Sequence, residues 1–90
     1  MWEVFEHRQV RRRIRKLPDE IVKRYEKWKD IVEFSGPAGL RLIRGFRDES
    51  LRGRWNGHRS SRLGDQYRII YRIGEKRLYV MVVDVTAHDY

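Results

Sequence analysis

The 90 residues of the chain give it the length of one small domain with a single modest core. The chain has no cysteine, which excludes disulfides and thiolate-metal sites and fits a reducing cytoplasm. Its net charge of +8 favours a polyanionic partner, with nucleic acid first and an acidic protein second.

No apolar run approaches the ~20 residues of a membrane span, so we expect no membrane partner. The opening M-W-E-V-F-E-H-R has neither a basic lead nor a long apolar stretch, so it does not predict a signal peptide. The positive charge is concentrated in residues 40–72, which contain nine basic and three acidic residues, and all nine basic residues are arginine. Because arginine binds phosphate through a planar fork and stacks on bases, this block is the expected binding region.

The N-terminal half predicts a strand followed by two helices. Residues 2–6 alternate as in a short strand. A basic helix follows, with apolar positions at Val10, Ile14 and Leu17. Pro18 marks the start of a second helix that runs to about Phe34, with its apolar stripe at Ile21, Tyr25, Trp28 and Val32. Because the link between the two helices is so short, we expect an antiparallel helix hairpin.

Residues 66–73, Q-Y-R-I-I-Y-R-I, form the clearest strand of the chain. Apolar and aromatic residues occupy one alternating set of positions, which fits a face directed at a core. Arg68 and Arg72 fall on the other face. Arginines on the exposed face of a central strand suit a phosphate-bearing ligand, and a merely solvated sheet face is the alternative.

The other C-terminal segments complete a meander of strands. Residues 58–63 predict a strand that the turn Gly64–Asp65 joins to the next one. Residues 77–86 are apolar at both alternating sets of positions, which places this strand inside the sheet. Residues 40–46 fit a strand or an irregular segment, and residues 47–57 fit a polar loop.

The order strand, two helices and three or four further strands predicts an α+β fold within a single domain, residues 1–90. The N-terminal strand and helix hairpin should pack on one face of an antiparallel sheet of three to five strands. The other face of the sheet should be concave and rich in arginine.

The run L-R-G-R-W-N-G-H-R-S-S-R-L-G-D-Q-Y-R-I-I-Y-R-I in residues 51–73, with the last apolar strand and the ending H-D-Y, resembles the RelE/ParE toxin superfamily. These are toxins of bacterial toxin–antitoxin pairs, so the resemblance implies a RelE-like fold and a cognate antitoxin. Members of the RelE, YoeB, YafQ and HigB kind cut messenger RNA, usually on the ribosome, whereas the ParE kind poisons DNA gyrase. His88 and Tyr90 resemble the C-terminal histidine and tyrosine of YoeB-like ribonucleases, which favours RNA cleavage.

The chemistry that the resemblance implies needs neither a metal nor a cofactor. The three histidines lie far apart in the sequence, and the acidic residues lack the spacing of metal ligands. RNA cleaves without a metal when its own 2′-hydroxyl attacks the adjacent phosphate. The protein must then supply a base, cations for the phosphorane and an acid for the departing 5′-oxygen.

Four residues are the candidate catalytic groups. Arg68 occupies the superfamily's Y-R-hydrophobic-hydrophobic-Y position and is the candidate phosphate clamp, with a structural salt bridge as the alternative. His88 is the candidate general acid, because imidazole titrates near neutral pH. Tyr90 is a candidate for base stacking or phosphate contact, and Glu49 for the general base. For these three the alternatives are a frayed histidine, a disordered last residue and a loop carboxylate without a role.

The candidate RNA-binding residues are Arg59, Arg62, Arg72 and His58, of which the first two are expected at the RNA backbone. A solvated strand edge is the alternative. Trp55 is expected to cover the core rather than to stack on a base.

Three functions from different classes fit these residues. The first is a messenger-RNA endoribonuclease that acts on the ribosome. The second is a ParE-like gyrase poison, which needs no catalytic histidine, and the third is a basic RNA-binding module without activity.

Overall fold

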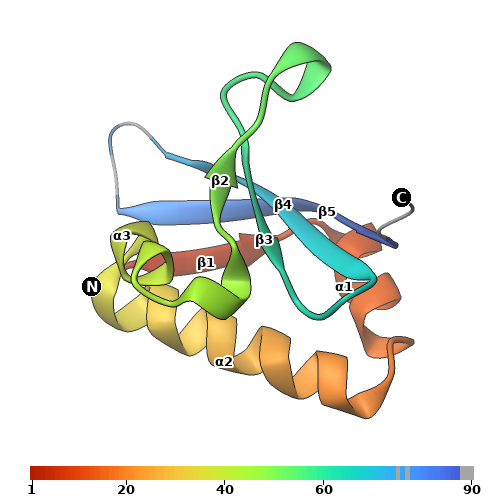
Figure 1. The fold of residues 1–90 in the computed structure, drawn as a ribbon. Coiled ribbons are helices and arrows are strands. Elements are labelled where there is room, and N and C mark those ends of the chain that lie inside the picture. Colours follow the sequence, from red (N-terminus) through yellow and green to blue (C-terminus); the bar gives the residue numbers. More distant parts are fainter. Residues whose placement is uncertain (75, 77, 88–90) are drawn as a thin grey trace.

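The computed structural model describes residues 1–74, 76 and 78–87 of the chain. Within these residues, three helices and five strands alternate with two 3-10 turns (Figure 1). The elements are β1 Glu3–Glu6, α1 Arg8–Arg15, α2 Asp19–Ser35, α3 Pro37–Arg41, β2 Glu49–Ser50, β3 Arg59–Arg62, β4 Tyr67–Ile73 and β5 Tyr79–Ala87, with 3-10 turns at Arg44–Phe46 and Gly53–Trp55.

The five strands form one sheet in the order β1-β5-β4-β3-β2. The four strands from β2 to β5 pair antiparallel, and β1 lies parallel to β5. The predicted α+β fold is therefore confirmed, with a parallel edge that the sequence did not indicate. Parallel pairing requires a long connection, and here everything from α1 to β4 provides it. β5 is an interior strand, as its apolar pattern predicted.

Helices cover one face of the sheet, and Figure 1 shows α2 lying along it. The apolar stripe predicted for α2 is buried over its whole length, and Trp28 is completely enclosed. The ring of Trp28 stacks on Tyr25 at 5.8 Å between centroids and meets Tyr71 of β4 edge-on at 5.3 Å. Val10 and Ile14 of α1 complete this core from the other helix. Helical periodicity thus predicted the covered face correctly.

The end of α2 depends on Gly36. This residue has a φ of 75°, in the left-handed region that glycine adopts without strain. Its N–H donates to the carbonyl of Val32 at 2.8 Å, and a side chain at this position would collide with the ring of Trp2. Pro37 then begins α3, where its missing N–H costs no hydrogen bond.

The segment 40–46 is not a strand, and it holds the end of α3 and a 3-10 turn. Leu40 and Phe46 are fully buried and anchor it, and the guanidinium carbon of Arg24 lies 4.4 Å from the centre of the Phe46 ring. The turns are too short to show a period in the sequence. The stretch 47–57, predicted as a loop, likewise contains β2 and a 3-10 turn, and we call it the β2–β3 excursion.

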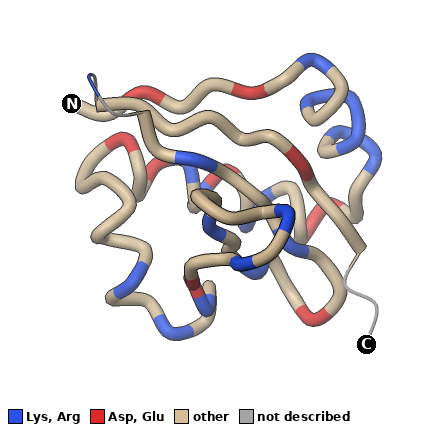
Figure 2. Tube along the Cα trace, turned by 90° about the horizontal axis from the view of Figure 1, so that it is seen from above, with Lys and Arg blue, Asp and Glu red and all other residues tan. Residues whose placement is uncertain are grey.

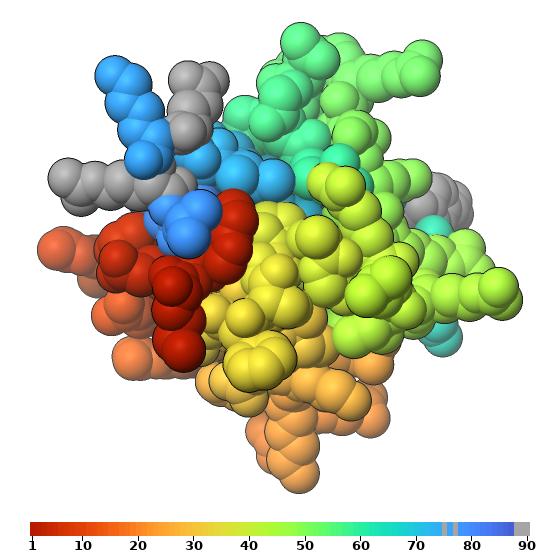
Figure 3. All heavy atoms as spheres, turned by 90° about the vertical axis from the view of Figure 1, so that its left-hand side faces the viewer, coloured from red at the N-terminus to blue at the C-terminus, as the bar shows by residue number. Residues whose placement is uncertain are grey.

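Parts of the chain that are distant in sequence meet at the N-terminal end of the sheet. The N–H of Glu3 donates to the carbonyl of Leu78 at 3.0 Å, and the N–H of Trp2 donates to the backbone carbonyl of Glu33 at 3.3 Å. Figure 3 looks onto this end, where the N-terminal segment in red adjoins the blue β4–β5 region and the yellow end of the helical layer. These contacts fix β1 beside β5.

The second face of the sheet carries no helix among the described residues, and we call it the open face. It is defined by the side chains that alternate with the buried ones of β3, β4 and β5 and by their partners on β1. Figure 2 looks down on the side opposite α2 and marks the Lys and Arg positions in blue. By sequence, β3, β4 and the β2–β3 excursion together carry seven arginines and two acidic residues. The open face is lined by Phe5, Ser60, Arg62, Arg68, Ile70, Arg72, Tyr79 and Met81.

Candidate nucleic-acid interface

Two of the predicted arginines lie side by side on the open face. Arg62 of β3 pairs directly with Arg68 of β4. Their neighbours Ser61 and Ile69 are buried on the helix-covered side, so alternation directs both arginines to the open face. The turn predicted between the strands brings them together, and it closes with a hydrogen bond from the N–H of Leu63 to the carbonyl of Tyr67 at 2.9 Å. Two guanidinium groups on adjacent strands concentrate positive charge where one phosphate can reach both.

Arg72 lies at the opposite end of β4. It is four residues from Arg68, which corresponds to about 13 Å along a strand. Ile70 stands between them and is almost fully buried, so the two arginines do not share one cluster. Arg72 pairs with Met81 of β5 and is exposed. Arg68 and Arg72, which the sequence pattern placed on one face of the strand, therefore lie in two separate regions of that face.

Arg59 is held by a carboxylate that the sequence analysis did not single out. Its Nε and Nη2 atoms each lie 2.8 Å from Oδ1 of Asp48, and its Nη1 donates to the hydroxyl of Ser50 at 2.8 Å. The Asp48 side chain is 0% exposed and also accepts hydrogen bonds from the hydroxyls of Ser61 and Tyr71. We call Asp48 and the side chains bound in this network the Asp48 cluster, which consists of Asp48, Ser50, Arg59, Ser61 and Tyr71. Its hydrogen bonds connect the β2–β3 excursion to β3 and β4. Its only signal in the sequence was an acid in an arginine-rich segment.

The Asp48 cluster changes the proton affinities of its members. Burial opposes the charged form of Arg59, but the hydrogen bond and charge of Asp48 outweigh it and raise the pKa of Arg59. Burial, together with the hydrogen bond to Asp48, raises the pKa of Tyr71. The cluster therefore keeps its arginine charged and its tyrosine neutral. A contact of Arg59 with RNA stays a prediction, made by an arginine that already holds this ion pair.

Glu49 and His58 lie apart from Arg68. Glu49 is exposed on β2 opposite Ser60, two strands away from β4, and strand spacings put it roughly 12 Å from Arg68. His58 is half-buried at the start of β3, and its Nδ1 lies 3.4 Å from the carbonyl oxygen of Asn56. A general base at Glu49 would thus have to reach across two strands.

Trp55 packs on its own loop. Its ring meets that of His58 edge-on at 5.3 Å between centroids, and the guanidinium carbon of Arg54 lies 5.6 Å from its centre. The buried core and the side chains packed against it draw on other residues of the described chain. The expectation that Trp55 covers the core is therefore wrong, because the β2–β3 excursion carries this residue away from the helix-covered face.

His88 and Tyr90 lie outside the described residues, and both remain predictions. The described part of β5 ends at Ala87, which pairs with Tyr67, and Thr86 pairs with Arg68. The last described residues of β5 therefore adjoin Arg68 rather than Arg72.

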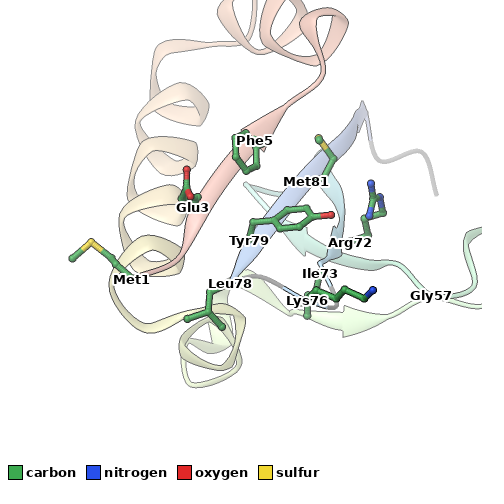
Figure 4. A pocket seen from close by; sticks show the side chains of 10 residues that line it. All are labelled: Met1, Glu3, Phe5, Gly57, Arg72, Ile73, Lys76, Leu78, Tyr79 and Met81. Carbon is green, nitrogen blue, oxygen red and sulfur yellow. The ribbon is translucent and has the colours of Figure 1, made fainter.

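The other end of the open face is hollowed into a groove of about 1070 Å³. Figure 4 shows side chains from β1, β4 and β5 around it, with the ring of Tyr79 at its centre. Tyr79 meets Phe5 edge-on at 5.7 Å between centroids. We call this the Tyr79 groove, and its lining is Met1, Glu3, Phe5, Gly57, Arg72, Ile73, Lys76, Leu78, Tyr79 and Met81.

Two further observations bear on the site. Among residues 1–74, 76 and 78–87, no group of three or more His, Asp and Glu side chains is placed to hold a metal ion. No helix within the described part of the chain is long and apolar enough to cross a membrane.

The fold matches solved structures of toxins over almost its whole length. A RelE–RelB complex from Pyrococcus horikoshii OT3 has 26% identity, with 97% of this chain and 94% of that chain covered and a TM-score of 0.75. A YoeB/ParE toxin from Agrobacterium tumefaciens has 17% identity, covers 97% and 99%, and has a TM-score of 0.76. A YoeB–YefM complex from Staphylococcus aureus has 14% identity, covers 99% and 99%, and has a TM-score of 0.74. No protein-family model and no curated protein sequence matches the chain.

These matches define the class of the molecule as a small α+β protein with helices on one face of a mostly antiparallel sheet, the fold of RelE-like toxins. The resemblance to the RelE/ParE superfamily that the sequence indicated is thereby confirmed. The chain is similar to the RelE toxins of that superfamily, and its fold is also that of the YoeB and YafQ toxins.

Proposed function

We propose that the chain is the toxin of a type II toxin–antitoxin pair and that it acts as a metal-independent endoribonuclease on messenger RNA. The observation that supports this proposal is the pairing of Arg62 with Arg68 on the open face of a RelE-like sheet. Two arginines on adjacent strands fit a phosphate whose charge grows as it passes to a phosphorane. Cleavage on the ribosome, in the cytoplasm, would stop translation.

In this mechanism the 2′-hydroxyl of the substrate attacks the adjacent phosphorus, and the bond to the 5′-oxygen breaks. A base takes the 2′-proton, and an acid protonates the 5′-oxygen, so this step yields a 2′,3′-cyclic phosphate and a 5′-hydroxyl. Attack of water on the cyclic phosphate then breaks its bond to the 2′-oxygen and gives a 3′-phosphate. Arg68 binds the non-bridging oxygens, with Arg62 beside it.

His88 is the proposed general acid, and Tyr90 the proposed contact to a base or a phosphate. The end of β5 beside Arg68 supports both assignments. Glu49 is the proposed general base, although its separation from Arg68 makes it the weaker member of the set. Arg59, Arg72 and His58 are the proposed contacts to the rest of the RNA, and the Asp48 cluster positions the first of them.

The partners in this proposal are messenger RNA, the ribosome and a cognate antitoxin. The first of the solved structures pairs a RelE toxin with RelB, and another pairs YoeB with YefM. A basic chain of net charge +8 fits an acidic antitoxin segment as well as RNA.

The test is cleavage of a defined messenger RNA on programmed ribosomes by the purified chain, followed by analysis of the product ends. We expect a 5′-hydroxyl fragment, and we expect a single 2′-deoxy nucleotide at the cut position to abolish cleavage there. Cleavage that survives the deoxy substitution would rule out 2′-hydroxyl attack. Intact messenger RNA together with inhibited DNA gyrase would favour the ParE-like function, and neither effect would favour the RNA-binding module.

A further inference from the structure

The Tyr79 groove is an apolar surface that the cleavage chemistry does not use. Phe5 is 45% exposed and Leu78 is 56% exposed, and both line the groove with Tyr79 and Met81. Other exposed apolar side chains occur, such as Phe34 at 85% and Leu42 at 86%, but these lie outside the groove. Contiguous apolar patches on a soluble protein mark interaction sites, whereas single exposed apolar residues are ordinary.

The charges of the groove are arranged along its length. Figure 4 shows Glu3 on the β1 side of Tyr79 and shows Arg72 and Lys76 on the opposite side. A bound segment therefore meets an apolar floor with two cations at one end and one carboxylate at the other. This pattern fits a peptide with an apolar face, an acidic end and a neutral or basic end.

The groove is separate from the proposed cleavage site. Arg72 is the strand arginine that lines the groove, and it lies about 13 Å along β4 from Arg68 of the proposed cleavage site. Its apolar floor lacks the concentration of cations that the phosphates of RNA require, whereas the neighbouring strands supply it at Arg62 and Arg68. A ligand of the groove is thus more apolar than RNA.

We propose that the Tyr79 groove is the anchoring site for an amphipathic, acidic segment of the antitoxin. The segment places apolar side chains against Phe5, Leu78 and Met81 and directs its acidic end at Arg72 and Lys76. This inference rests on the proposed function, and it adds that affinity for the antitoxin comes mainly from the groove. Neutralisation and the cleavage step therefore depend on different residues of one face, apart from Arg72, which lines the groove and is also a proposed contact to the RNA.

The test compares groove variants with variants of equally exposed apolar residues elsewhere. The groove pair is Phe5→Ser with Leu78→Ser, and the matched control is Phe34→Ser with Leu42→Ser. The probe is the purified protein encoded by the gene adjacent to this one. We expect the groove pair to weaken binding of this protein by about 30-fold or more, as for central interface residues, and the control to change it little.

The single substitution Leu78→Glu provides a second variant that keeps most of the exposed surface intact. It places a carboxylate where the acidic segment must dock, so binding should fall while messenger RNA cleavage stays at the wild-type rate. In cells, these groove variants should arrest growth even when the adjacent gene is expressed. Equal neutralisation of wild type, groove variants and control overturns the inference and leaves the proposed function standing.

A photo-cross-linking residue at position 78 identifies the occupant directly. We expect the cross-linked peptide to come from the product of the adjacent gene and to contain apolar residues next to Asp or Glu. A cross-link to a second copy of this chain or to RNA overturns the inference. If neither the wild type nor any variant cleaves RNA, the proposed function is wrong. The binding comparison tests the groove separately, so the two ideas can fail independently.

Discussion

The helix-covered face and the open face of the sheet are built from the same strands, yet different contacts complete them. On the covered face, Trp28 and Tyr71 are fully buried and meet edge-on. On the open face, Phe5 keeps about half of its surface exposed, as Leu78 does at the edge of the Tyr79 groove, and arginines occupy neighbouring positions. Alternation along each strand thus separates residues that stabilise the fold from residues that remain available to a partner.

The difference between the two faces shows which residues the packing of the fold accounts for. The covered face has the composition and contacts of a core, and no partner is needed to account for it. The open face combines partly exposed apolar side chains with arginines, and these are the residues that we propose to contact partners. Substitutions on the two faces should therefore separate stability from function.

The largest effect on stability should come from Trp28→Ala on the covered face. The fully buried indole leaves a cavity, so the free energy of unfolding should fall by about 3–5 kcal/mol. Phe34→Ala, at a side chain that is 85% exposed, is the control and should change it by about 0.5 kcal/mol or less. Urea denaturation measures both, and equal losses would contradict the assignment of the core.

Asp48→Ala should have the next largest effect. It leaves the partly buried Arg59 without its carboxylate and removes the acceptor for Tyr71, so we expect a loss of about 3 kcal/mol. Glu49→Ala, at the exposed neighbouring position, should cost about 0.5 kcal/mol or less. If the two variants unfold at the same urea concentration, the Asp48 cluster does not hold the β2–β3 excursion in place.

Two tyrosines of the covered face should also make the free energy of unfolding depend on pH in the alkaline range. Burial, with the hydrogen bond to Glu6, raises the pKa of Tyr25, and burial also raises that of Tyr71. A raised pKa in the folded state means that this stabilisation is fully present below the unfolded value of about 10 and is lost as the pH rises above it. Stability should therefore fall above pH 10, and less steeply in Tyr25→Phe. An unchanged slope in that variant would contradict the role of Tyr25.

The smallest effect is expected at the rim of the sheet. Arg13 of α1 and Asp84 of β5 form an ion pair at 2.7 Å, with side chains that are 50% and 21% exposed. Because solvent screens such a pair, Arg13→Ala should reduce the free energy of unfolding by about 1 kcal/mol or less, and 1 M salt should remove most of the difference. A loss as large as that of Asp48→Ala would mean that this contact belongs to the core.

The sequence predicted the covered face well because its information is local. The spacing of Ile21, Tyr25, Trp28 and Val32 is a property of one helix, and it defines the side that packs. The stop at Gly36 is also local, since glycine suits its positive φ. Segment 40–46 could not be predicted in this way, because Leu40 and Phe46 are held by contacts from other elements rather than by a period.

The candidate site was only partly predictable, because it depends on register between strands. The sequence identified Arg62 and Arg68, but only strand pairing places them opposite each other. It grouped Arg59 with them, although Asp48 holds that guanidinium, and the partner of a partly buried arginine is set by tertiary structure. The Tyr79 groove joins β1 to β5 through parallel pairing, which no short-range pattern indicated.

The most direct test of the account is single-turnover cleavage of messenger RNA on programmed ribosomes by Arg68→Ala, with Arg8→Ala as a matched control. Arg8 is an exposed arginine of α1, so its loss changes the net charge equally but leaves the open face intact. We expect Arg68→Ala to lower both binding and the cleavage rate, and Arg8→Ala to stay near wild type. His88→Ala should keep binding and lose about 10²–10⁴-fold in the cleavage step, as for a lost general acid. Wild-type cleavage by Arg68→Ala would contradict the claim that the open face is the site of catalysis.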